Sequence, residues 1–249
     1  METTLRAPSG GIALDRWLDH LEEHLPIARQ GDDPEGVHQV RAAAARLDVW
    51  LRLGGYCVLR PDLRWLRKGA GAVRDIDVLL ARGVSPELEA MLRERLAGAR
   101  PAMLACFSHP RTAGLLFALR CLPPLDREPA RRALRGWTRR AQRRGRRVDF
   151  RAGALEELHG LRRHVRRLRF AREWLELPAR KIKRAHDELG ALNDLAVLLE
   201  LSRACSSPIT NGDALAIGAP AELVERSALQ RVEALRAWSR CQREISAGA

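Results

Sequence analysis

The chain has 249 residues, of which 46% are hydrophobic and 30% are charged, and its formal net charge is +13 at pH 7. The apolar content excludes an intrinsically disordered chain, and the length is enough to bury a substantial core in one or two domains. A sequence pI of about 11.0 indicates a polyanionic partner, so the candidate classes are nucleic acid, an anionic membrane and polyphosphate.

The positive charge is concentrated in the second half of the chain. Residues 1–124 contain 17 Lys and Arg against 15 Asp and Glu, whereas residues 125–249 contain 27 against 16. A charge that only kept the protein soluble would not need this imbalance. We therefore expect a binding surface that depends more on the second half.

Cysteine usage and hydropathy predict a soluble cytoplasmic protein. The five cysteines are odd in number and scattered through apolar stretches, which predicts reduced thiols in a cytosolic protein. No C-x-x-C pair indicates zinc. The first ten residues, METTLRAPSG, lack an apolar run of signal-peptide type, and no segment approaches 18 uninterrupted apolar residues. We expect no membrane association.

The first half is predicted to be a series of helices. Residues 11–30 are amphipathic, and Pro26 is expected to kink or end that helix. A second helix carries His38 and ends near Leu53, before a Gly-Gly pair. Further helices are expected from Pro61 to Gly83, from Ser85 to Leu104 with a bend at Pro101, and at 111–121.

The second half begins with nine arginines in the seventeen residues from Arg131 to Arg147. A helix is expected where this cluster starts, but Gly145 and the mutual repulsion of the arginines argue against a helix at its end. Further helices are expected at 158–175, after the basic run at 180–184, and at 223–238, with a loop at 206–220. Because no period-2 alternation persists anywhere, the fold class is predicted to be all-α.

The segment 158–175, LHGLRRHVRRLRFAREWL, has the clearest functional pattern. At about 100° per residue, one flank of a helix carries His159, Arg162, Arg166 and Arg169, beside an apolar flank that can pack. Guanidinium groups repeated every turn repel one another unless an anion or interleaved carboxylates lie across them, and this flank contains no acid. The pattern favours an anion site, although a solvated arginine face is the alternative for this helix alone.

A second copy of the pattern occurs near the N-terminus. An H-x-x-R pair at His38 and Arg41 precedes its counterpart at His159 by 121 residues. Further along, GAVRDIDVLL at 71–80 matches GALNDLAVLL at 190–199. Two ordered matches predict a duplicated helical unit, with an N-terminal repeat at 12–122 and a C-terminal repeat at 126–246.

With these motifs the chain resembles the CHAD family (conserved histidine alpha-helical domain). Each half of a CHAD protein carries a helix that begins H-x-x-R with further basic residues, then a helix with an L-G-x-x-x-D or R-D-x-D-V signature. Here those signatures stand at 74–78 and 189–194, and the resemblance covers residues 12 to 245. It implies a single CHAD-like domain over 1–249, two pseudo-symmetric helical bundles, a basic central groove or pore, and binding of inorganic polyphosphate.

The first half departs from the family pattern. Ala45 and Asp48 stand where the family has basic residues, although Arg46 remains and Arg52 lies on the same flank one turn beyond Asp48. We therefore expect the second half to contribute more to polyphosphate binding. We also expect Asp48→Arg to tighten binding.

Two pairs of side chains, one of acids and one of histidines, have a spacing that raises the question of a metal site. Asp75 and Asp77 cannot easily hold one ion, because residues i and i+2 of a helix point about 200° apart. Asp75, and Asp194 in the second repeat, are instead expected to pair with and orient a basic side chain. His20 and His24 have the i,i+4 spacing of a chelating pair, but no third ligand is evident nearby, so no metal is expected.

Inorganic polyphosphate is the ligand that these patterns favour. It is a chain of closely spaced charges without bases, so its site needs rows of Arg and Lys and no aromatic stacking surface, and aromatics are only 4% of the chain. A protein that binds the phosphate backbone of nucleic acid is the alternative, as is an accessory domain of polyphosphate or triphosphate metabolism. With no Ser/His/Asp set, Walker loop or zinc motif, the chain is expected to have no catalysis of its own and no cofactor, and to associate with polyphosphate granules and their proteins.

The residues expected to bind polyphosphate are basic side chains on the repeated helices. For His38 and His159 two roles stay open: each packs or caps within its helix, or each donates an N–H to a phosphate oxygen. The full set is His38, Arg41, Arg46, Arg52, Arg64, Arg67, Lys68, Arg74, His159, Arg162, Arg163, Arg166, Arg167, Arg169, Lys183 and Arg184.

Overall fold

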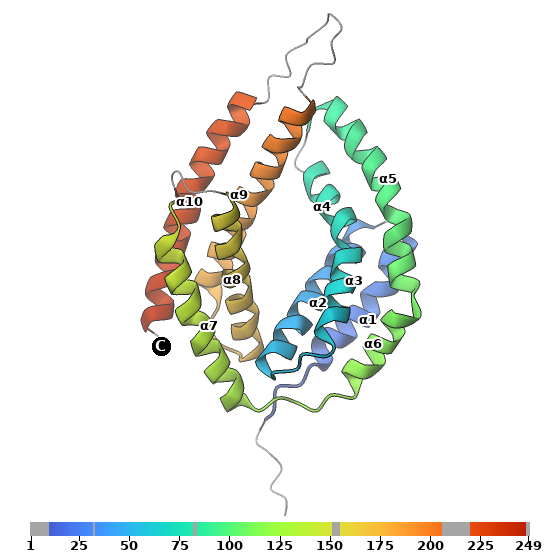
Figure 1. Cartoon of the computed structure of the whole chain (residues 1–249), viewed down its shortest axis with the longest axis vertical. Helices are drawn as coiled ribbons and strands as arrows, with labels where there is room; N and C mark the ends of the chain where they lie inside the picture. Colours follow the sequence, from blue (N-terminus) through green and yellow to red (C-terminus); the bar gives the residue numbers. More distant parts are fainter. Residues whose placement is uncertain (1–9, 32, 82–83, 151–154, 206–219, 248–249) are drawn as a thin grey trace, which may run out of the picture.

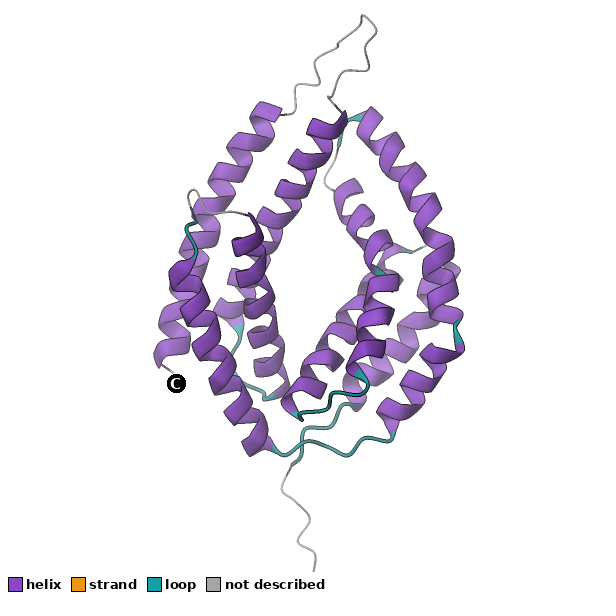
Figure 2. Cartoon of the chain, in the orientation of Figure 1, coloured by secondary structure: helices purple, strands orange, loops and turns teal. Residues whose placement is uncertain are grey.

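The protein is helical throughout the part of the chain that the structure describes. The structure is a computed structural model, which describes residues 10–31, 33–81, 84–150, 155–205 and 220–247. These residues form ten α-helices and no strand, and the only β-type pairing among them is an antiparallel bridge between Ile12 and Leu125 (Figure 2). The all-α fold class predicted from the sequence is confirmed.

Six helices make up the first half of the molecule, on the right of Figure 1. Side-chain caps explain where two of them begin, because Asp33 accepts the Glu35 amide before α2 and Ser85 accepts the Leu88 amide before α5. The six are α1 (Asp15–Gln30), α2 (Pro34–Leu53), α3 (Arg60–Gly69), α4 (Gly71–Leu80), α5 (Pro86–Ser108) and α6 (Pro110–Arg120).

Four helices make up the second half, on the left of Figure 1. They are α7 (Arg127–Arg147), α8 (Leu155–Trp174), α9 (Arg180–Cys205) and α10 (Pro220–Ala247). Successive helices pack on one another: α7 on α8, α8 on α9 and α9 on α10, as α1 packs on α2 and α2 on α3 in the first half. In the first half, α3 and α4 follow α2, as α9 follows α8 in the second half. The duplication of the chain is inferred from the sequence.

The single helix expected from Pro61 to Gly83 is wrong. The chain breaks at Ala70 into α3 and α4, and Gly83 lies outside the described residues. Gly69 shows why the break falls there: a Cβ at this position would lie 2.5 Å from the sulfur of Cys106. The glycine lets the end of α3 approach α5 closely, and the chain turns directly after that contact.

Two other helix ends differ from the sequence expectation, and one agrees with it. Helix α1 ends at Gln30, as expected, with Pro26 inside it, whereas α5 continues past Leu104 to Ser108. Helix α7 continues through its whole arginine cluster. Gly145 does not end the helix. A Cβ at this position would overlap the indole of Trp238, so the glycine lets α10 pack closely on α7. The loop expected at 206–220 lies outside the described residues except for Pro220, which starts α10.

A large hydrophobic core contains residues of both halves. Helices α2 and α8 are in contact, and the rings of Trp50 and Trp174 lie 6.5 Å apart between centroids. Leu161 and Val165, on the apolar flank of α8, are fully buried in this core, and each such side chain contributes about 1.5 to 3 kcal/mol. The apolar flank of α8 is therefore fixed against the core, and the arginine flank beside it is fixed with it.

Candidate functional site

Four arginines from three helices converge where the two halves pack together. They are Arg41 from α2, Arg67 from α3, and Arg162 and Arg166 from α8, and they form the central cluster. The pKa of Arg166 is lowered to about 9, first by burial and then by the positive charges of the other three members. Burial, with the charge of Arg41, also lowers the pKa of Arg67 and that of Arg162. Each guanidinium thus disfavours the charge on the next.

The central cluster contains polar groups that have no partner in the described part of the chain. The Nε atoms of Arg67 and Arg162 are buried and have no hydrogen-bond partner among the described residues. A buried polar group left in this state costs about 1 to 3 kcal/mol, and more when it is charged. Four positive charges at one place, two of them with an unused buried donor, form an arrangement that an anion with several oxygens would stabilise.

Asp48 is the acid that partly offsets this charge. Its side chain is only 8% exposed and accepts hydrogen bonds from Nε of Arg52 at 2.9 Å and from Nε of Arg60 at 3.3 Å. Its negative charge also favours the charged form of Arg67 and of Arg166. Asp48 therefore acts as a buried counter-ion. The expectation that Asp48→Arg tightens binding stays a prediction. The ion pairs of Asp48 argue against it, because the change would remove this counter-ion and add a buried charge.

Two further acids lie beside the central cluster. Arg41 donates from Nη1 to Asp75 at 2.9 Å and to the Gly71 carbonyl at 3.0 Å. The charge of Asp194 favours the charged form of Arg162. Asp75 and Asp194, the acids at matching positions of the two repeats, thus each lie near one member of the central cluster. Asp75 contacts Arg41 directly.

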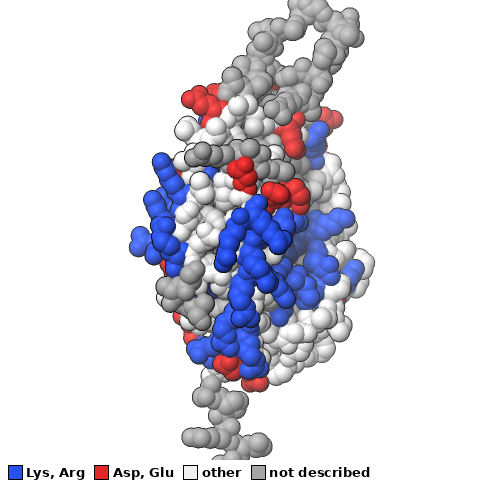
Figure 3. Space-filling view, turned by 60° about the vertical axis from the view of Figure 1, so that its left-hand side comes forward, with Lys and Arg blue, Asp and Glu red and all other residues white. Residues whose placement is uncertain are grey.

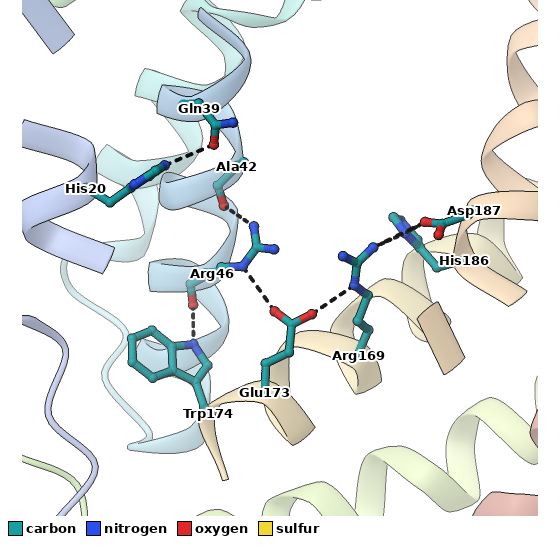
Figure 4. Close-up of polar contacts among 9 residues, drawn as sticks. All are labelled: His20, Gln39, Ala42, Arg46, Arg169, Glu173, Trp174, His186 and Asp187. Carbon is teal, nitrogen blue, oxygen red and sulfur yellow. Dashed lines mark hydrogen bonds and ion pairs between the residues drawn. The ribbon is translucent and has the colours of Figure 1, made fainter. Parts of the chain in front are cut away.

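A second group of charges ties the halves together (Figure 4). Glu173 on α8 accepts from Nε of Arg46 on α2 at 3.1 Å and from Nε of Arg169 at 2.9 Å. Nη1 of Arg169 also contacts Asp187 and Nδ1 of His186, both at 3.2 Å. We call these five residues the bridging network. Arg46 and Arg169, both expected in the anion site, are occupied by these acids.

Arg46 is held further by aromatic side chains. Its guanidinium lies 4.0 Å from the centre of the Trp17 ring and 4.3 Å from that of Phe170. The indole N–H of Trp174 donates to the backbone carbonyl of Arg46 at 2.9 Å (Figure 4). A cation between two rings is stabilised by about 0.5 to 2 kcal/mol for each ring. The surroundings of Arg46 are those of a structural residue.

The histidines of the two H-x-x-R pairs lie in different environments. Burial and the charge of Arg74 lower the pKa of His38. Nδ1 of His159 lies 2.8 Å from the side-chain oxygen of Asn193 on α9. Because Nδ1 of His159 is in this contact, its Nε2 is the nitrogen that can contact a ligand.

His186 on α9 is a residue of the site that the sequence did not single out. Its Nε2 is buried without a hydrogen-bond partner. Burial and the charges of Arg162, Arg169 and Arg166 lower its pKa, against the raising effect of Asp187. A signal was present, because His186 lies less than one turn after Lys183 in the basic run that opens α9.

The remaining expected residues lie around the central cluster or outside it. The guanidinium carbon of Arg167 lies 5.6 Å from the centre of the Trp137 ring. Burial lowers the pKa of Arg167, and so do the charges of Arg52, Arg60 and Arg140. Arg163 pairs with Glu156 at 3.0 Å. Five of the expected residues have exposed side chains, namely Arg64, Lys68, Arg163, Lys183 and Arg184.

Helix α7 adds a separate basic surface. All nine arginines from Arg131 to Arg147 are exposed. Figure 3 brings the side of the molecule that carries α7 forward, and Lys and Arg side chains form a long band on it. Only Glu128 forms ion pairs with these nine among the described residues, with Arg135 at 3.2 Å and Arg132 at 3.8 Å.

One group of side chains in the described part of the chain has the spacing of a metal site. The donor atoms of His20, Glu23 and His24 on α1 lie within 4.8 Å of one another. The expectation that no third ligand lies near the two histidines is therefore wrong. Each ring already uses one nitrogen in a hydrogen bond, to Gln39 and to the His20 carbonyl, both at 2.9 Å. One nitrogen of each ring and the Glu23 carboxylate remain as donors.

The fold and the central cluster define an all-α protein with a basic site between two sets of helices, and comparison with known proteins gives its family. Residues 12–203 match the family model of the CHAD domain, so the chain belongs to the CHAD domain family. No curated protein sequence matches the chain at a significant level. None of the described helices combines the length and the apolar character needed to cross a bilayer.

Two solved structures share the fold. The crystal structure of the CHAD domain from the plant Ricinus communis matches with a TM-score of 0.66 at 21% identity, over 99% of this chain and 94% of that chain. PptA from Streptomyces chartreusis matches with a TM-score of 0.66 at 17% identity, over 93% of this chain and 95% of that chain. At these identities the likeness shows the fold alone.

Proposed function

We propose that the protein binds inorganic polyphosphate through the central cluster and does not alter it chemically. The observation that carries this proposal is the convergence of Arg41, Arg67, Arg162 and Arg166 with two buried guanidinium nitrogens unpartnered. A polyphosphate chain offers closely spaced anionic oxygens, each able to accept from a guanidinium. Bound phosphates would neutralise the mutual repulsion that burial strengthens.

Membership of the CHAD family supports the same ligand, because the family resemblance implies polyphosphate binding. Association with polyphosphate granules would follow from this binding. His38 and His186 lie where they can add N–H donors, since both are affected electrostatically by members of the central cluster. The bridging network and the Asp48 ion pairs would hold the helices in place around the bound chain.

The pairing of the nearby acids supports binding without catalysis. Asp48 is occupied by Arg52 and Arg60, and Asp75 by Arg41. An arginine that donates to a carboxylate oxygen occupies a lone pair that a proton or a metal would need, so these acids are less available for catalysis. We expect long-chain polyphosphate incubated with the protein and Mg²⁺ to keep its length on a gel and to release no phosphate.

The side chains on the surface favour polyphosphate over single-stranded nucleic acid. Proteins that bind single strands stack bases on exposed aromatic rings. Among the described residues, the large hydrophobic side chains that are exposed include only one aromatic, Phe117. Trp50 and Trp238 are fully buried. Binding to the phosphates of duplex DNA is the alternative that requires a direct test.

A competition experiment separates the two ligands. Labelled long-chain polyphosphate bound to the protein is challenged with unlabelled polyphosphate or with duplex DNA at equal phosphate concentration and near-physiological salt. We expect polyphosphate to compete far better, because a flexible chain can enter the central cluster and a stiff duplex cannot. Equal competition by DNA would show a generic basic surface and overturn the proposal.

The dependence of affinity on salt gives a second check. The logarithm of the association constant should fall linearly with the logarithm of salt concentration, because phosphate contacts release counterions. Each arginine removed from the central cluster should reduce the slope by roughly 0.7, taking the coefficient for single strands. An affinity insensitive to salt would mean that other contacts dominate.

A further inference from the structure

Helix α7 presents a row of arginines that the central cluster does not use. Arg139, Arg143 and Arg146 follow the spacing i, i+4, i+7 and are all exposed. At 100° per residue they lie within about 60° of one another, on the side of the helix opposite the buried Ala141 and Gly145. The row therefore faces outward along the length of the helix.

This row lacks the acids that normally accompany arginines on an exposed helix. The ion pairs of Glu128 reach only Arg132 and Arg135, at the start of the helix. No described acid forms an ion pair with Arg139, Arg143 or Arg146. Like charges at i,i+4 on a helix destabilise it, so a row of this kind is unfavourable unless an anion lies along it.

A second flank of α7 connects this row to the central cluster. A Cβ at Gly160 of α8 would lie 2.6 Å from Nη2 of Arg144, so this glycine leaves room for the guanidinium against α8. The charge of Arg140 acts on Arg167, which is the neighbour of Arg166 in the sequence of α8. Positive charge therefore continues from the central cluster through Arg167 to α7, and Figure 3 shows the band on that side of the molecule.

We propose that the outward row of α7 is an outer track for a polyphosphate chain whose other part is held in the central cluster. The proposal rests on the proposed function and extends it to a chain-length preference. From Arg131 to Arg147 the helix spans about 24 Å, at 1.5 Å per residue. A tripolyphosphate in the central cluster is too short to extend along α7 as well, whereas a long chain can occupy both sites.

Polyphosphate suits this path better than other polyanions. A chain that leaves the central cluster has to bend around α8 to follow α7, which a flexible polyphosphate can do and a stiff duplex cannot. Once one part of the chain is bound, the next part is present at high effective concentration beside α7, so weak contacts with the row add to the overall affinity. The track would make long chains the preferred ligand without any base-specific or aromatic contact.

Two matched triple variants test the outer track. The first replaces the row, as Arg139→Gln, Arg143→Gln and Arg146→Gln. The second, Arg236→Gln, Arg240→Gln and Arg243→Gln, removes the same charge at the same i, i+4, i+7 spacing from exposed positions on α10. Glutamine has nearly the helix propensity of arginine, so both should stay folded, as circular dichroism can verify. Titration calorimetry with long-chain polyphosphate and with tripolyphosphate measures the effect.

We expect the α7 variant to lose at least about tenfold in affinity for long chains, the equivalent of about 1.4 kcal/mol. Its salt slope for long chains should fall by about 2, at roughly 0.7 for each arginine. Its affinity for tripolyphosphate should equal that of the wild type, and the α10 variant should change neither ligand by more than about twofold.

Two results would overturn the outer track while leaving the proposed function intact. One is an unchanged affinity of the α7 variant for long chains, and the other is an equal loss in the α10 variant, which would mean that net charge alone is felt. Failure of the proposed function has a different signature. In that case Arg162→Gln with Arg166→Gln would leave tripolyphosphate binding unchanged, whatever the α7 variant does.

Discussion

The two H-x-x-R helices hold their arginines in different ways. On α2 each of three arginines has an acid: Arg41 contacts Asp75, Arg46 contacts Glu173 and Arg52 contacts Asp48. On α8, Arg162 keeps a buried, unpartnered Nε, and Arg166 has the most strongly lowered arginine pKa in the described part of the chain. Each arginine of α2 is thus paired with an acid, whereas α8 has Arg162 and Arg166 without an ion pair among the described residues.

This difference gives a physical cause for the asymmetry expected from the sequence. The count of basic residues suggested that the second half dominates, yet Arg169 of α8 is occupied by Glu173 and Asp187. Conversely, the first half contributes Arg67, whose Nε is buried without a partner. What matters for an anion is therefore the number of guanidinium groups without an acid, and not the number of arginines on a helix.

The largest effect is expected from Asp48→Asn. Asparagine keeps the shape of the side chain and removes the charge that offsets Arg52, Arg60 and the central cluster. Breaking a buried ion pair by removing one partner is strongly destabilising, and here the free energy of unfolding should fall by about 3 kcal/mol. Urea denaturation measures this change.

Bound polyphosphate should restore much of the stability that Asp48→Asn removes, because its charge replaces that of Asp48. The same denaturation experiment with saturating ligand tests the point. A matched control is Asp62→Asn, which removes an acid of α3 that pairs with Arg111 away from the central cluster. If ligand restored both variants equally, Asp48 would have no special relation to the anion site.

The next largest effect compares two double variants. Arg162→Gln with Arg166→Gln removes two unpaired groups, so the affinity for polyphosphate should fall by about 2 kcal/mol, or about thirtyfold, after solvent screening. The stability of the free protein should stay equal or rise, because repulsion is relieved. Calorimetry and thermal unfolding measure the two quantities.

Arg41→Gln with Arg46→Gln should show the reverse pattern. Arg46 is held by Glu173 and two aromatic rings, so this variant should lose about 2 kcal/mol of stability and less affinity than the α8 pair. The comparison between the halves fails if the α2 pair loses more affinity, or if the α8 pair loses more stability.

A smaller effect is expected when the bridging network is opened. Glu173→Gln removes the carboxylate that Arg46 and Arg169 share. The Glu173 side chain is 29% exposed, so the loss of stability should be about 1 kcal/mol. For a domain of this size that corresponds to a fall in Tm of about 2 to 4 °C. The affinity for polyphosphate should rise a few-fold, because two guanidinium groups are released. A lower affinity would show that Glu173 positions the site rather than occupying its arginines.

The sequence predicts the local parts of this arrangement and misses those that depend on tertiary contacts. The helical fold and the apolar and basic flanks of α8 follow from the helical period of the hydrophobic residues. The two H-x-x-R pairs are read directly from the sequence. The division between paired and unpaired arginines does not, because Glu173 lies 127 residues from Arg46 and meets it only through packing of α8 on α2. The pairing of Asp48 is only half local, since Arg52 lies one turn along the same helix but Arg60 lies on another helix.

The smallest effect, and one that again separates the halves, is the pH dependence from His38 and His186. Burial is the first cause that lowers both pKa values below the ordinary 6.5. The charge of Arg74 acts next on His38, and the charges of Arg162, Arg169 and Arg166 act on His186. In the unfolded chain both imidazoles would bind protons near 6.5, before they do so in the folded protein. The stability of the free protein should therefore fall as the pH drops below about 6.5, and should level off below the two lowered pKa values.

Polyphosphate should respond in the opposite direction. Phosphate oxygens favour the charged imidazole, so binding raises both pKa values and takes up protons, and affinity should increase a few-fold as the pH falls from about 7.5 to about 5.5. Calorimetry in buffers of different ionisation enthalpy measures the uptake directly. Because His186 faces more of the unpaired arginines than His38 does, His186→Gln should remove more of this uptake than His38→Gln. Equal losses in the two variants would mean that the halves contribute alike to the site, and an affinity unchanged over this pH range would mean that neither ring lies near the bound anion.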